Sequence, residues 1–445
     1  MAENSYLSME AGAHSRLSRK NVKPTFIDLF AGCGGLSLGM CQSGWNGLFG
    51  VELRADAFST YKANFLNGTR LSIKWPRWLE PHAWNIDSLL KKHEPRLRKL
   101  RGCVDLVCGG PPCQGFSYSG KRNRDDPRNR LVLRHIEFVE LVAPIFVLLE
   151  NVPGFSVEHG KKARSQRVGS QKGRPAISGA QRLRDRLSKS YIIDDCLVCA
   201  SKFGVPQIRN RYFAVGVRKD TGFSAEPGWA ADLIQNMRRE FLDLHHLGNR
   251  PVTAREAIWD LETTRRQGSI VDYAPDATCN SPTGFTQIEY KPSKKQNCFI
   301  RIMRHGMNGQ APNSLRIARH TPQVKERFQF ILKEYPRGRR LNDEERSHLG
   351  VKKQRIVPLD PEAPAHTLTT LPDDLLHYKE PRILTAREYA RLQSFPDWFE
   401  FHGKYTTGGP RRSVECPRYT QIGNAVPPLV AEAWGYALRG LLDNL

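Results

Sequence analysis

The sequence predicts an α/β protein built on a mostly parallel, doubly wound sheet with helices on both faces. Two observations predict this class. Apolar strand-like runs alternate with helical patterns through residues 1–220, and these runs lack the polar alternation of a strand with one face in water. The runs assigned to strands are residues 25–30, 48–52, 104–108, 145–150 and 212–217.

A glycine-rich loop follows the first strand, at the edge where parallel sheets bind ligands. It reads AGCGG over residues 31–35 and leads into a helical pattern from Leu36, so the backbone can turn sharply beside a helix N-terminus. The second strand ends in Glu52, which could accept hydrogen bonds from a ribose diol. Ser37 replaces the third glycine of the dinucleotide fingerprint, which favours a nucleoside cofactor without a pyrophosphate. A tight turn with no ligand is the alternative.

The third strand leads into the segment GGPPCQGFS, residues 109–117. Two glycines and two prolines before Cys113 make a stiff turn that would hold the thiol at the edge of the sheet, as a nucleophile requires. A buried structural cysteine is the alternative. Residues 121–130 contain five basic side chains and could close over a phosphate backbone.

Charged side chains also end or precede the later strands. Glu150 closes an apolar run, so we expect its pKa to be raised and its carboxyl group to be able to donate a proton. A helix-capping or salt-bridged glutamate is the alternative. Gln207, Arg209 and Arg211 alternate along the chain before residues 212–217, so the two guanidinium groups could point into one cleft or form a charged strand edge in water.

The composition is globular and strongly basic. Of 445 residues, 39% are hydrophobic and 25% are charged, and 68 Lys and Arg against 45 Asp and Glu give a net charge of +23. This excess indicates a polyanionic partner. Residues 263–356 contain 19 basic and 8 acidic side chains, and residues 156–190 contain 10 and 2. The second segment is rich in Gly and Ser and is either a mobile insertion that meets the polyanion or a solvated loop.

Nothing in the sequence predicts export or membrane insertion. No apolar run approaches the roughly 18 residues of a membrane span, and residues 1–23 form a polar leader without a secretory signal. The ten cysteines lack a disulfide framework, which suits a reducing, cytoplasmic compartment. Cys196 and Cys199 have metal-like spacing without a second pair, so no metal site is expected.

Six segments together resemble the cytosine carbon-5 DNA methyltransferases, in the order of that family and over nearly the whole chain. The resemblance implies a Rossmann-like, doubly wound methyltransferase domain and a smaller, basic target-recognition domain. It also implies DNA (cytosine-5-)-methyltransferase activity with S-adenosyl-L-methionine as cofactor. The segments are FIDLFAGCGG (residues 26–35), GGPPCQGFS (109–117), ENVPG (150–154), QIRNR (207–211), RILTAREYARLQSFPD (382–397) and QIGNAVPP (421–428).

The resemblance also implies roles for individual residues. Cys113 would add to a flipped-out cytosine, Glu150 would protonate its ring, and Arg209 and Arg211 would position the base and the catalytic loop. The residues expected to bind the cofactor are Phe30, Ala31, Gly32, Gly34, Gly35, Glu52, Asn85, Ile86, Pro112, Leu131, Asn424 and Val426. The residues expected to contact DNA are Gln114, Ser117, Arg122, Arg124, Arg128 and Gln207.

One position departs from the family pattern. The family commonly has an aspartate before the isoleucine that contacts adenine, whereas Asn85 precedes Ile86 here and Asp87 follows it. The contact to the adenine amino group could therefore come from either Asn85 or Asp87.

We expect a flexible leader over residues 1–23 and a catalytic domain over residues 24–262, with the basic insertion at about 156–190. Residues 263–380 would form the recognition domain, and residues 381–445 would complete the catalytic domain. In this last segment, Thr385 and Glu388 predict a capping box for a short helix through Gln393, and residues 429–445 have apolar residues at helical spacing.

We expect the protein to be a bacterial monomer that associates with double-stranded DNA. A cognate restriction endonuclease is expected as a second partner. No membrane partner is expected. A tRNA methyltransferase of the same fold is the main alternative, and the long basic recognition segment argues against it. The intact set of Cys113, Glu150 and Arg209 disfavours a non-catalytic DNA-binding relative. The missing third glycine disfavours a dinucleotide oxidoreductase.

Overall fold

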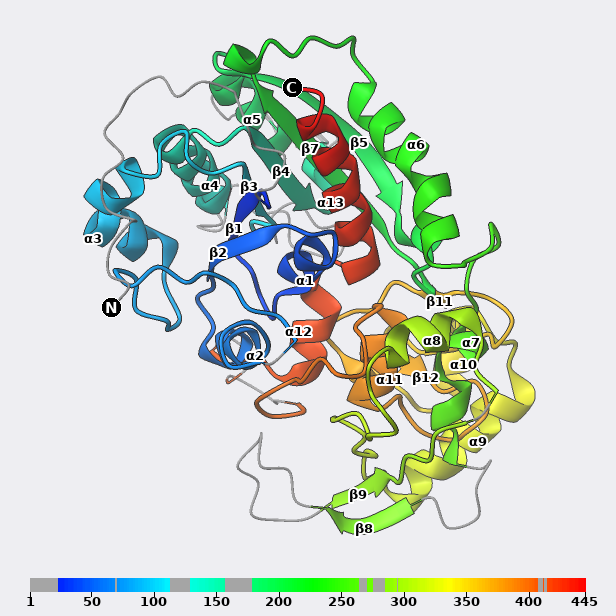
Figure 1. Ribbon diagram of the computed structural model, residues 1–445. Helices are drawn as coiled ribbons and strands as arrows, with labels where there is room; N and C mark the ends of the chain where they lie inside the picture. Colours follow the sequence, from blue (N-terminus) through cyan, green and yellow to red (C-terminus); the bar gives the residue numbers. More distant parts are fainter. Residues whose placement is uncertain are drawn as a thin grey trace, which may run out of the picture.

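The computed structural model describes residues 23–68, 70–112, 129–156, 178–263, 270–274, 285–293, 295–406, 411 and 414–445. A six-stranded sheet with the order β2-β1-β3-β4-β7-β5 forms the centre of the larger body (Figure 1). Strands β2, β1, β3 and β4 pair in parallel, whereas β7 is antiparallel to both β4 and β5. The strands are β1 (Thr25–Leu29), β2 (Asn46–Val51), β3 (Leu106–Gly109), β4 (Phe146–Asn151), β5 (Tyr191–Cys199) and β7 (Asn210–Arg218).

The five expected strands are confirmed, with their ends displaced by one or two residues. Strand β5 was not among them. Its sequence carries Asp194 and Asp195, and both carboxylates have structural partners: Asp194 accepts hydrogen bonds from the backbone N–H groups of Gly228 and Ala230, at 2.9 and 3.0 Å. Asp195 accepts one from the hydroxyl of Tyr212 at 2.9 Å. These polar residues cap a helix and bond a neighbouring strand, which hides the strand from a search for apolar runs.

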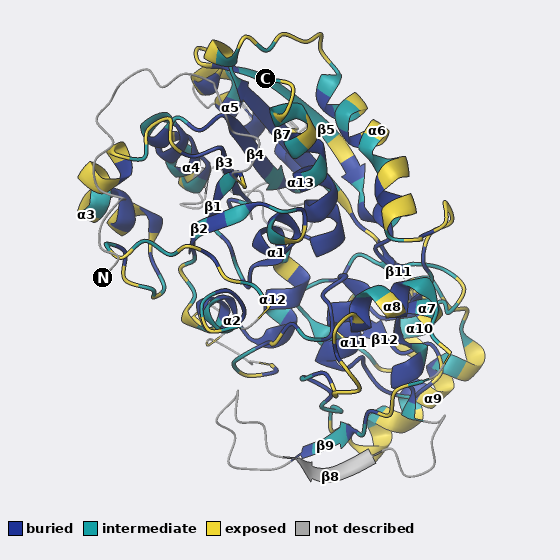
Figure 2. Cartoon of the chain, viewed as in Figure 1, coloured by how far each residue is buried: buried dark blue, intermediate teal, exposed yellow. Residues whose placement is uncertain are grey.

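Helices cover both faces of the sheet, so successive residues of a strand enter different cores. In β1, Phe26 packs into the core on one face, whereas Ile27 and Leu29 pack into the core on the other. This alternation confirms the doubly wound arrangement, and both cores are dark in Figure 2. The first face carries α1 (Gly35–Gln42), α6 (Trp229–Leu244) and α13 (Pro428–Leu442), and the second carries α3 (Ile86–Arg98), α4 (Asn129–Val142) and α5 (Gly179–Leu187).

Helix α5 lies within the segment expected to be a basic insertion. Ser178 caps it by accepting a hydrogen bond from the backbone N–H of Gln181 at 3.1 Å, and Leu183 and Leu187 are buried in the second core. The second half of the expected insertion is therefore a core helix whose basic residues lie on its outer side. Residues 157–177 lie outside the described residues.

The C-terminal segment packs against the N-terminal half of the sheet. Helix α13 lies on α1, where a Cβ at Gly39 would stand 2.4 Å from the backbone nitrogen of Glu432. The ring nitrogen of Trp45 donates a hydrogen bond to the carbonyl of Gly435 at 2.9 Å. Two further helices precede α13, and the expected capping box of Thr385 and Glu388 is present at the first of them. They are α11 (Ala386–Leu392) and α12 (Arg418–Asn424).

A smaller body lies below the sheet in Figure 1 and contains most of the expected recognition region. It has its own small core, which includes Phe328, Ile331 and Leu341. It also touches the larger body directly, because β11 pairs in parallel with β6 (Gln207–Ile208). Its elements are β8 (Ile270–Ala274), β9 (Phe285–Ile288), α8 (Cys298–Arg304), α9 (Pro322–Glu334), α10 (Asp343–His348), β10 (Val357–Pro358), β11 (Ala365–His366) and β12 (Leu375–Leu376).

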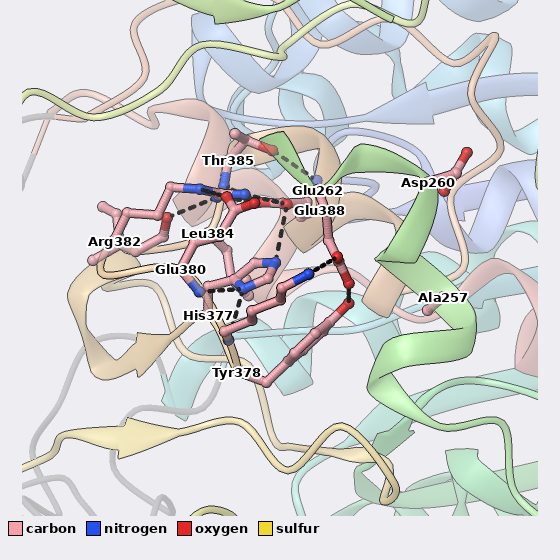
Figure 3. Close-up of polar contacts among 12 residues, drawn as sticks. Ala257, Asp260, Glu262, His377, Tyr378, Glu380, Arg382, Leu384, Thr385 and Glu388 are labelled. Carbon is pink, nitrogen blue, oxygen red and sulfur yellow. Dashed lines mark hydrogen bonds and ion pairs between the residues drawn. The ribbon is translucent and has the colours of Figure 1, made fainter. Parts of the chain in front are cut away.

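The two ends of this smaller body meet at a buried carboxylate (Figure 3). Glu262, where the chain enters the body, accepts hydrogen bonds from the hydroxyl of Tyr378 and, at 2.9 Å, from the ammonium group of Lys379, where the chain leaves. Next to it, Arg382 forms a bidentate pair with Glu388, with N···O distances of 2.7 and 2.8 Å. The segments by which the chain enters and leaves the smaller body are therefore fixed to each other and to α11.

The remaining α-helices of the described chain are α2 (Ala55–Phe65), which buries one side with Tyr61 and Phe65, and the short α7 (Ala254–Ile258). Within the described ranges, no helix combines the length and the apolar character that crossing a bilayer demands.

Candidate active site

The glycine loop after β1 is shaped by positive backbone angles. Phe30, Gly32 and Gly34 have φ values of 60°, 57° and 99°, which lets the chain reverse between β1 and α1 within a few residues. A Cβ at Gly34 would lie 2.3 Å from the ring of Phe65, so only glycine fits there. Ala31 anchors the turn by donating its N–H to the carbonyl of Val51 at 2.9 Å. The loop is therefore a fixed cradle next to the end of β2.

Glu52 stands at the end of β2 and holds the loop in place. One carboxylate oxygen accepts a hydrogen bond from the N–H of Gly32 at 2.9 Å, and the other accepts one from the N–H of Arg54 at 2.7 Å. Burial raises the pKa of Glu52, while these hydrogen bonds and Arg54 lower it. Each carboxylate oxygen can accept a second hydrogen bond, so the group can still bind a pair of hydroxyls.

The C-terminal segment closes the other side of the cradle. A Cβ at Gly35 would lie 2.3 Å from the carbonyl oxygen of Val426, so the loop and this segment touch through their backbones. Asn424 ends α12 with an exposed side chain, whereas Val426 is buried. The structure thus brings the loop and the segment of Asn424 and Val426 together, although Asn424 lies 389 positions after Gly35 in the sequence.

The segment before α3 reaches the same place from a third direction. The backbone N–H of Trp84 donates to the carbonyl of Glu52 at 2.8 Å. Asn85 caps α3, its side-chain oxygen accepting from the N–H of Asp87 at 2.7 Å, and Ile86 is buried. Asp87 pairs with Arg134 at 2.5 Å. Both side chains considered for the adenine contact thus already have polar partners within the protein.

Phe30 and Leu131 lie on the second face of the sheet. Both are partly buried against the core that contains α3 and α4. Leu131 belongs to the first turn of α4. The two side chains are therefore on the face from which Ile86 also approaches.

Glu150 and Arg211 form a mostly buried ion pair at the end of β4. Their side chains are 12% and 14% exposed, with 3.0 Å between the Nε of Arg211 and the Oε1 of Glu150. Burial raises the pKa of Glu150, and Arg211 and Arg209 oppose this increase. The other carboxylate oxygen lies 3.0 Å from the position of a Cβ at Gly110. The carboxylate therefore stands against the backbone of the GGPPC turn.

Arg209 has different partners from Arg211. Its guanidinium is fully buried and donates to the carbonyls of Leu368, Gly423 and Ala425, at 3.3, 2.9 and 3.2 Å. Strand β6 ends at Ile208 and β7 begins at Asn210, so the alternation that would place both guanidinium groups in one open cleft is interrupted at Arg209. That expectation is corrected: Arg211 meets the carboxylate, and Arg209 ties together backbone segments.

A comparison with protein-family models decides the family. The model described as C-5 cytosine-specific DNA methylase matches residues 24–439. The chain belongs to this family. It is a DNA (cytosine-5-)-methyltransferase family enzyme, and members of the family use S-adenosyl-L-methionine as the methyl donor.

Individual relatives agree with this membership over most of their lengths. The chain is 29% identical to the type II methyltransferase M.DdeI of Desulfomicrobium norvegicum, covering 94% of this chain and 89% of the relative. It is also 29% identical to the type II methyltransferase M1.HphI of Haemophilus parahaemolyticus, covering 94% and 88%. A solved structure of a candidate DNA modification methyltransferase encoded within an E. coli prophage superposes with a TM-score of 0.61 at 27% identity, covering 95% of this chain and all of that one.

The cradle of this methylase fits the cofactor of its family. The Glu52 carboxylate has acceptor capacity left for a ribose diol. In the loop beside it, Gly34 and Gly35 pack so closely against Phe65 and the carbonyl of Val426 that a side chain would clash, whereas the space next to Gly32 is open. The sulfonium cofactor has no pyrophosphate, in keeping with Ser37 at the third fingerprint position, where its N–H and hydroxyl bond to Asp28 at 3.1 and 2.6 Å.

Several expected site residues of the methylase lie outside the described residues. Pro112, which is exposed, is the last described residue before them. Their roles stay predictions. They are Cys113, Gln114, Ser117, Arg122, Arg124 and Arg128.

Gln207 is placed differently from the expectation that it contacts DNA. Its side chain is fully buried. The amide nitrogen donates to the side chain of Gln393 and to the carbonyl of Leu392, and the amide oxygen accepts from the N–H of Leu368 at 2.9 Å. Because its polar atoms are occupied within the protein, Gln207 holds the two bodies together, and its amide is not available to DNA.

Two residues near the site escaped the sequence analysis. Asn151 donates its side-chain N–H to the carbonyl of Pro111 at 3.0 Å, and Gln393 donates to the carbonyl of Ala425 at 2.6 Å. Asn151 directly follows Glu150, so its position in the segment ENVPG was an available signal. Gln393 carried none, because its partners are remote in the sequence.

Proposed function

We propose that this methylase transfers a methyl group from S-adenosyl-L-methionine to carbon 5 of a flipped-out cytosine within a specific double-stranded DNA sequence. We further propose that Cys113 is the nucleophile, Glu150 the proton donor, and Arg211 the group that orients Glu150. The observation that carries this assignment is the Glu150–Arg211 pair standing against the turn that leads to Cys113.

The chemistry requires a nucleophile because carbon 5 of cytosine is itself a poor one. Addition of the Cys113 thiolate to carbon 6 would move electron density onto carbon 5. A carboxyl group with a raised pKa, as burial gives Glu150, could hold a proton at ring N3 and stabilise the adduct. Loss of the carbon-5 proton and elimination of Cys113 would then release 5-methylcytosine and regenerate the thiolate.

The cofactor would lie between the glycine loop and the C-terminal segment. Glu52 would bind the ribose hydroxyls, and Gly32, Gly34 and Gly35 would leave room for the methionine part. Phe30, Ile86 and Leu131 would flank the adenine ring. When bound, S-adenosylmethionine supplies a methyl group that the sulfonium charge makes electrophilic.

The smaller body would hold the DNA. Residues 263–356 carry a large part of the net positive charge, which suits phosphate contacts and reading of the major groove. Since M.DdeI and M1.HphI are type II methyltransferases, we propose that this protein protects bacterial DNA against a cognate restriction endonuclease and works in the cytoplasm.

Radiolabelled cofactor and DNA of mixed sequence test this function. We expect 5-methylcytosine at one recurring sequence, located by bisulfite sequencing, and no product with Cys113→Ala. The matched control is Cys103→Ala, which removes an exposed thiol far from the turn and should leave the rate unchanged. Full activity of Cys113→Ala would refute the proposed nucleophile. Methylation of tRNA in place of DNA would favour the alternative substrate.

A further inference from the structure

We propose that Asn151 is a positioning residue that fixes the turn before Cys113 relative to the carboxylate of Glu150. The inference rests on the proposed function, because it concerns the placement of the proposed nucleophile. It assigns to Asn151 a role in the rate of the chemical step, distinct from a role in binding.

The first observation is where the hydrogen-bond ladder between β3 and β4 stops. Its last pair is Gly109 with Leu149, and within the part of the chain that the structure describes, β4 continues to Asn151 without a partner strand on that side. Pro111 and Pro112 follow in the neighbouring chain, and proline has no backbone N–H to continue a ladder. The side-chain N–H of Asn151 donates to the carbonyl of Pro111 at 3.0 Å. The side-chain amide of Asn151 thus supplies a hydrogen bond between the two chain segments at the point where their backbones no longer pair.

The second observation is that the Asn151 side chain is itself held firmly. It is 4% exposed, and its side-chain oxygen accepts a hydrogen bond from the N–H of Val152 at 2.8 Å. Its backbone pairs with Tyr212 of β7. The two side-chain hydrogen bonds define which end of the amide faces Pro111, so a donor is fixed at that point.

The third observation is that the same turn touches Glu150. The Oε2 of Glu150 lies 3.0 Å from the position of a Cβ at Gly110. Two consecutive residues of β4 therefore lie beside two consecutive residues of the turn. Cys113 comes two residues after Pro111, and two residues span at most about 7 Å. Fixing the carbonyl of Pro111 therefore restricts where the nucleophile can stand relative to the proton donor.

The test is the substitution Asn151→Asp, which keeps the size and the acceptor toward Val152 but removes the donor toward Pro111. The reaction to follow is formation of the covalent adduct with target DNA that contains 5-fluorocytosine, together with single-turnover methyl transfer. We expect both rates to fall by about 10- to 100-fold, since a displacement of about 1 Å at a reacting group can reduce a rate by that much. The dissociation constants for DNA and cofactor should stay within about twofold.

A pH series separates positioning from general damage. A protonated aspartate has an O–H that can donate to the carbonyl of Pro111, so the defect of Asn151→Asp should shrink as pH falls. Glu150 titrates in both proteins, and Arg211 and Arg209 are the charged groups that act on it, so the quantity to compare is the ratio of variant rate to wild-type rate at each pH. The variant Asn151→Ala has no titratable group, and its ratio should not vary with pH.

The matched control is Asn64→Asp. Asn64 is also buried, donates to the carbonyl of Glu400 at 2.8 Å and accepts from the N–H of Glu400 at 2.9 Å, but it lies in α2, away from the turn. This variant should melt at a lower temperature and form the adduct at the wild-type rate. If Asn151→Asp behaves like the control, or if neither Asn151 variant folds, the positioning role is refuted. A wild-type protein that forms no adduct and methylates no DNA would instead refute the proposed function itself.

Discussion

Arg391 and Asp397 form a bidentate ion pair in the interior of the protein, six residues apart in the sequence. The Nε of Arg391 is 2.9 Å from Oδ1 of Asp397, and its Nη2 is 2.7 Å from Oδ2. Neither side chain has any exposed area. Burial alone would raise the pKa of Asp397, but Arg391 and the neighbouring guanidinium groups lower it overall.

The same pair joins three parts of the chain. Arg304 of α8 contacts Asp397 at 3.1 Å, and Asp260, just before the smaller body, contacts Arg391. Buried charges of this kind are poor sources of net stability, but they are strongly unfavourable when one partner is removed. We infer that the network fixes the orientation of the smaller body on α11.

Neutralising Asp397 should therefore destabilise the protein strongly. The substitution Asp397→Asn leaves Arg391 and Arg304 without their shared anion, and we expect the free energy of unfolding to fall by about 3–5 kcal/mol. Urea denaturation measures this change. The control is Glu94→Gln, which breaks the exposed pair of Glu94 and Arg98 at 2.7 Å and should lower stability by no more than about 1 kcal/mol. Equal losses in the two variants would mean that the buried network has no special role.

The rate of methyl transfer should fall as pH rises through the raised pKa of Glu150, because the proposed mechanism uses the protonated carboxyl group. Arg211 lowers that pKa, so Arg211→Gln should move the alkaline limb of the single-turnover profile to higher pH, as well as reducing the rate. Glu150→Gln should reduce the rate by about 10²- to 10⁴-fold and remove that limb. A limb that moves to lower pH in Arg211→Gln would contradict the assignment.

Arg209 should influence cofactor affinity without touching the cofactor. Two of its three carbonyl partners, those of Gly423 and Ala425, flank Asn424. Lysine cannot span all three, and each lost charged hydrogen bond is worth about 1.5–3 kcal/mol. We expect Arg209→Lys to weaken S-adenosylmethionine binding by about tenfold or more in calorimetry. Arg101→Lys serves as the control, since Arg101 also donates to two carbonyls but lies at the surface. An equal loss of cofactor affinity in Arg101→Lys would exclude a specific role of Arg209.

Asp28 should make stability depend on pH in an unusual direction. Burial raises the pKa of Asp28 from 3.8 to about 7, although its hydrogen bonds from Ser37 oppose this. The folded protein thus holds a proton that the unfolded chain releases, so stability is lost as pH rises from about 4 to about 7 and changes no further above that. The difference amounts to roughly 4 kcal/mol at most. In urea denaturation, the free energy of unfolding of Asp28→Asn should depend less on pH over this range than that of the wild type. A difference between the two proteins that is the same at every pH would disprove the role of Asp28.

Features that depend on neighbouring residues were predictable from the sequence. The glycine loop, the helix that follows it, Glu52 at the end of β2 and the capping box at Thr385 all appear in the expected places. Each depends on local backbone geometry or on a hydrogen bond within a few residues. The raised pKa of Glu150 followed from its place at the end of an apolar strand.

Features that depend on remote partners were not predictable. Gln207 was expected to contact DNA, but its side-chain amide bonds to Gln393, 186 residues away. Arg209 lies at a break between two strands that only the pairing of β6 with β11 reveals. The last part of the basic segment forms α5, because two leucines in it face the sheet. A one-residue break between strands, or one long-range contact, thus gives a residue a different position from the one that the local sequence pattern predicts.

The contact between Tyr378 and Glu262 means that the chain leaves the smaller body almost where it enters it. A segment whose two ends coincide can be exchanged for one of another length without moving the sheet. Such a layout would let natural variation exchange the smaller body, which we propose reads the DNA, while the reaction centre stays the same. A chimaera that keeps Glu262, Tyr378 and Lys379 and takes the intervening residues from a relative should therefore acquire the relative's target sequence.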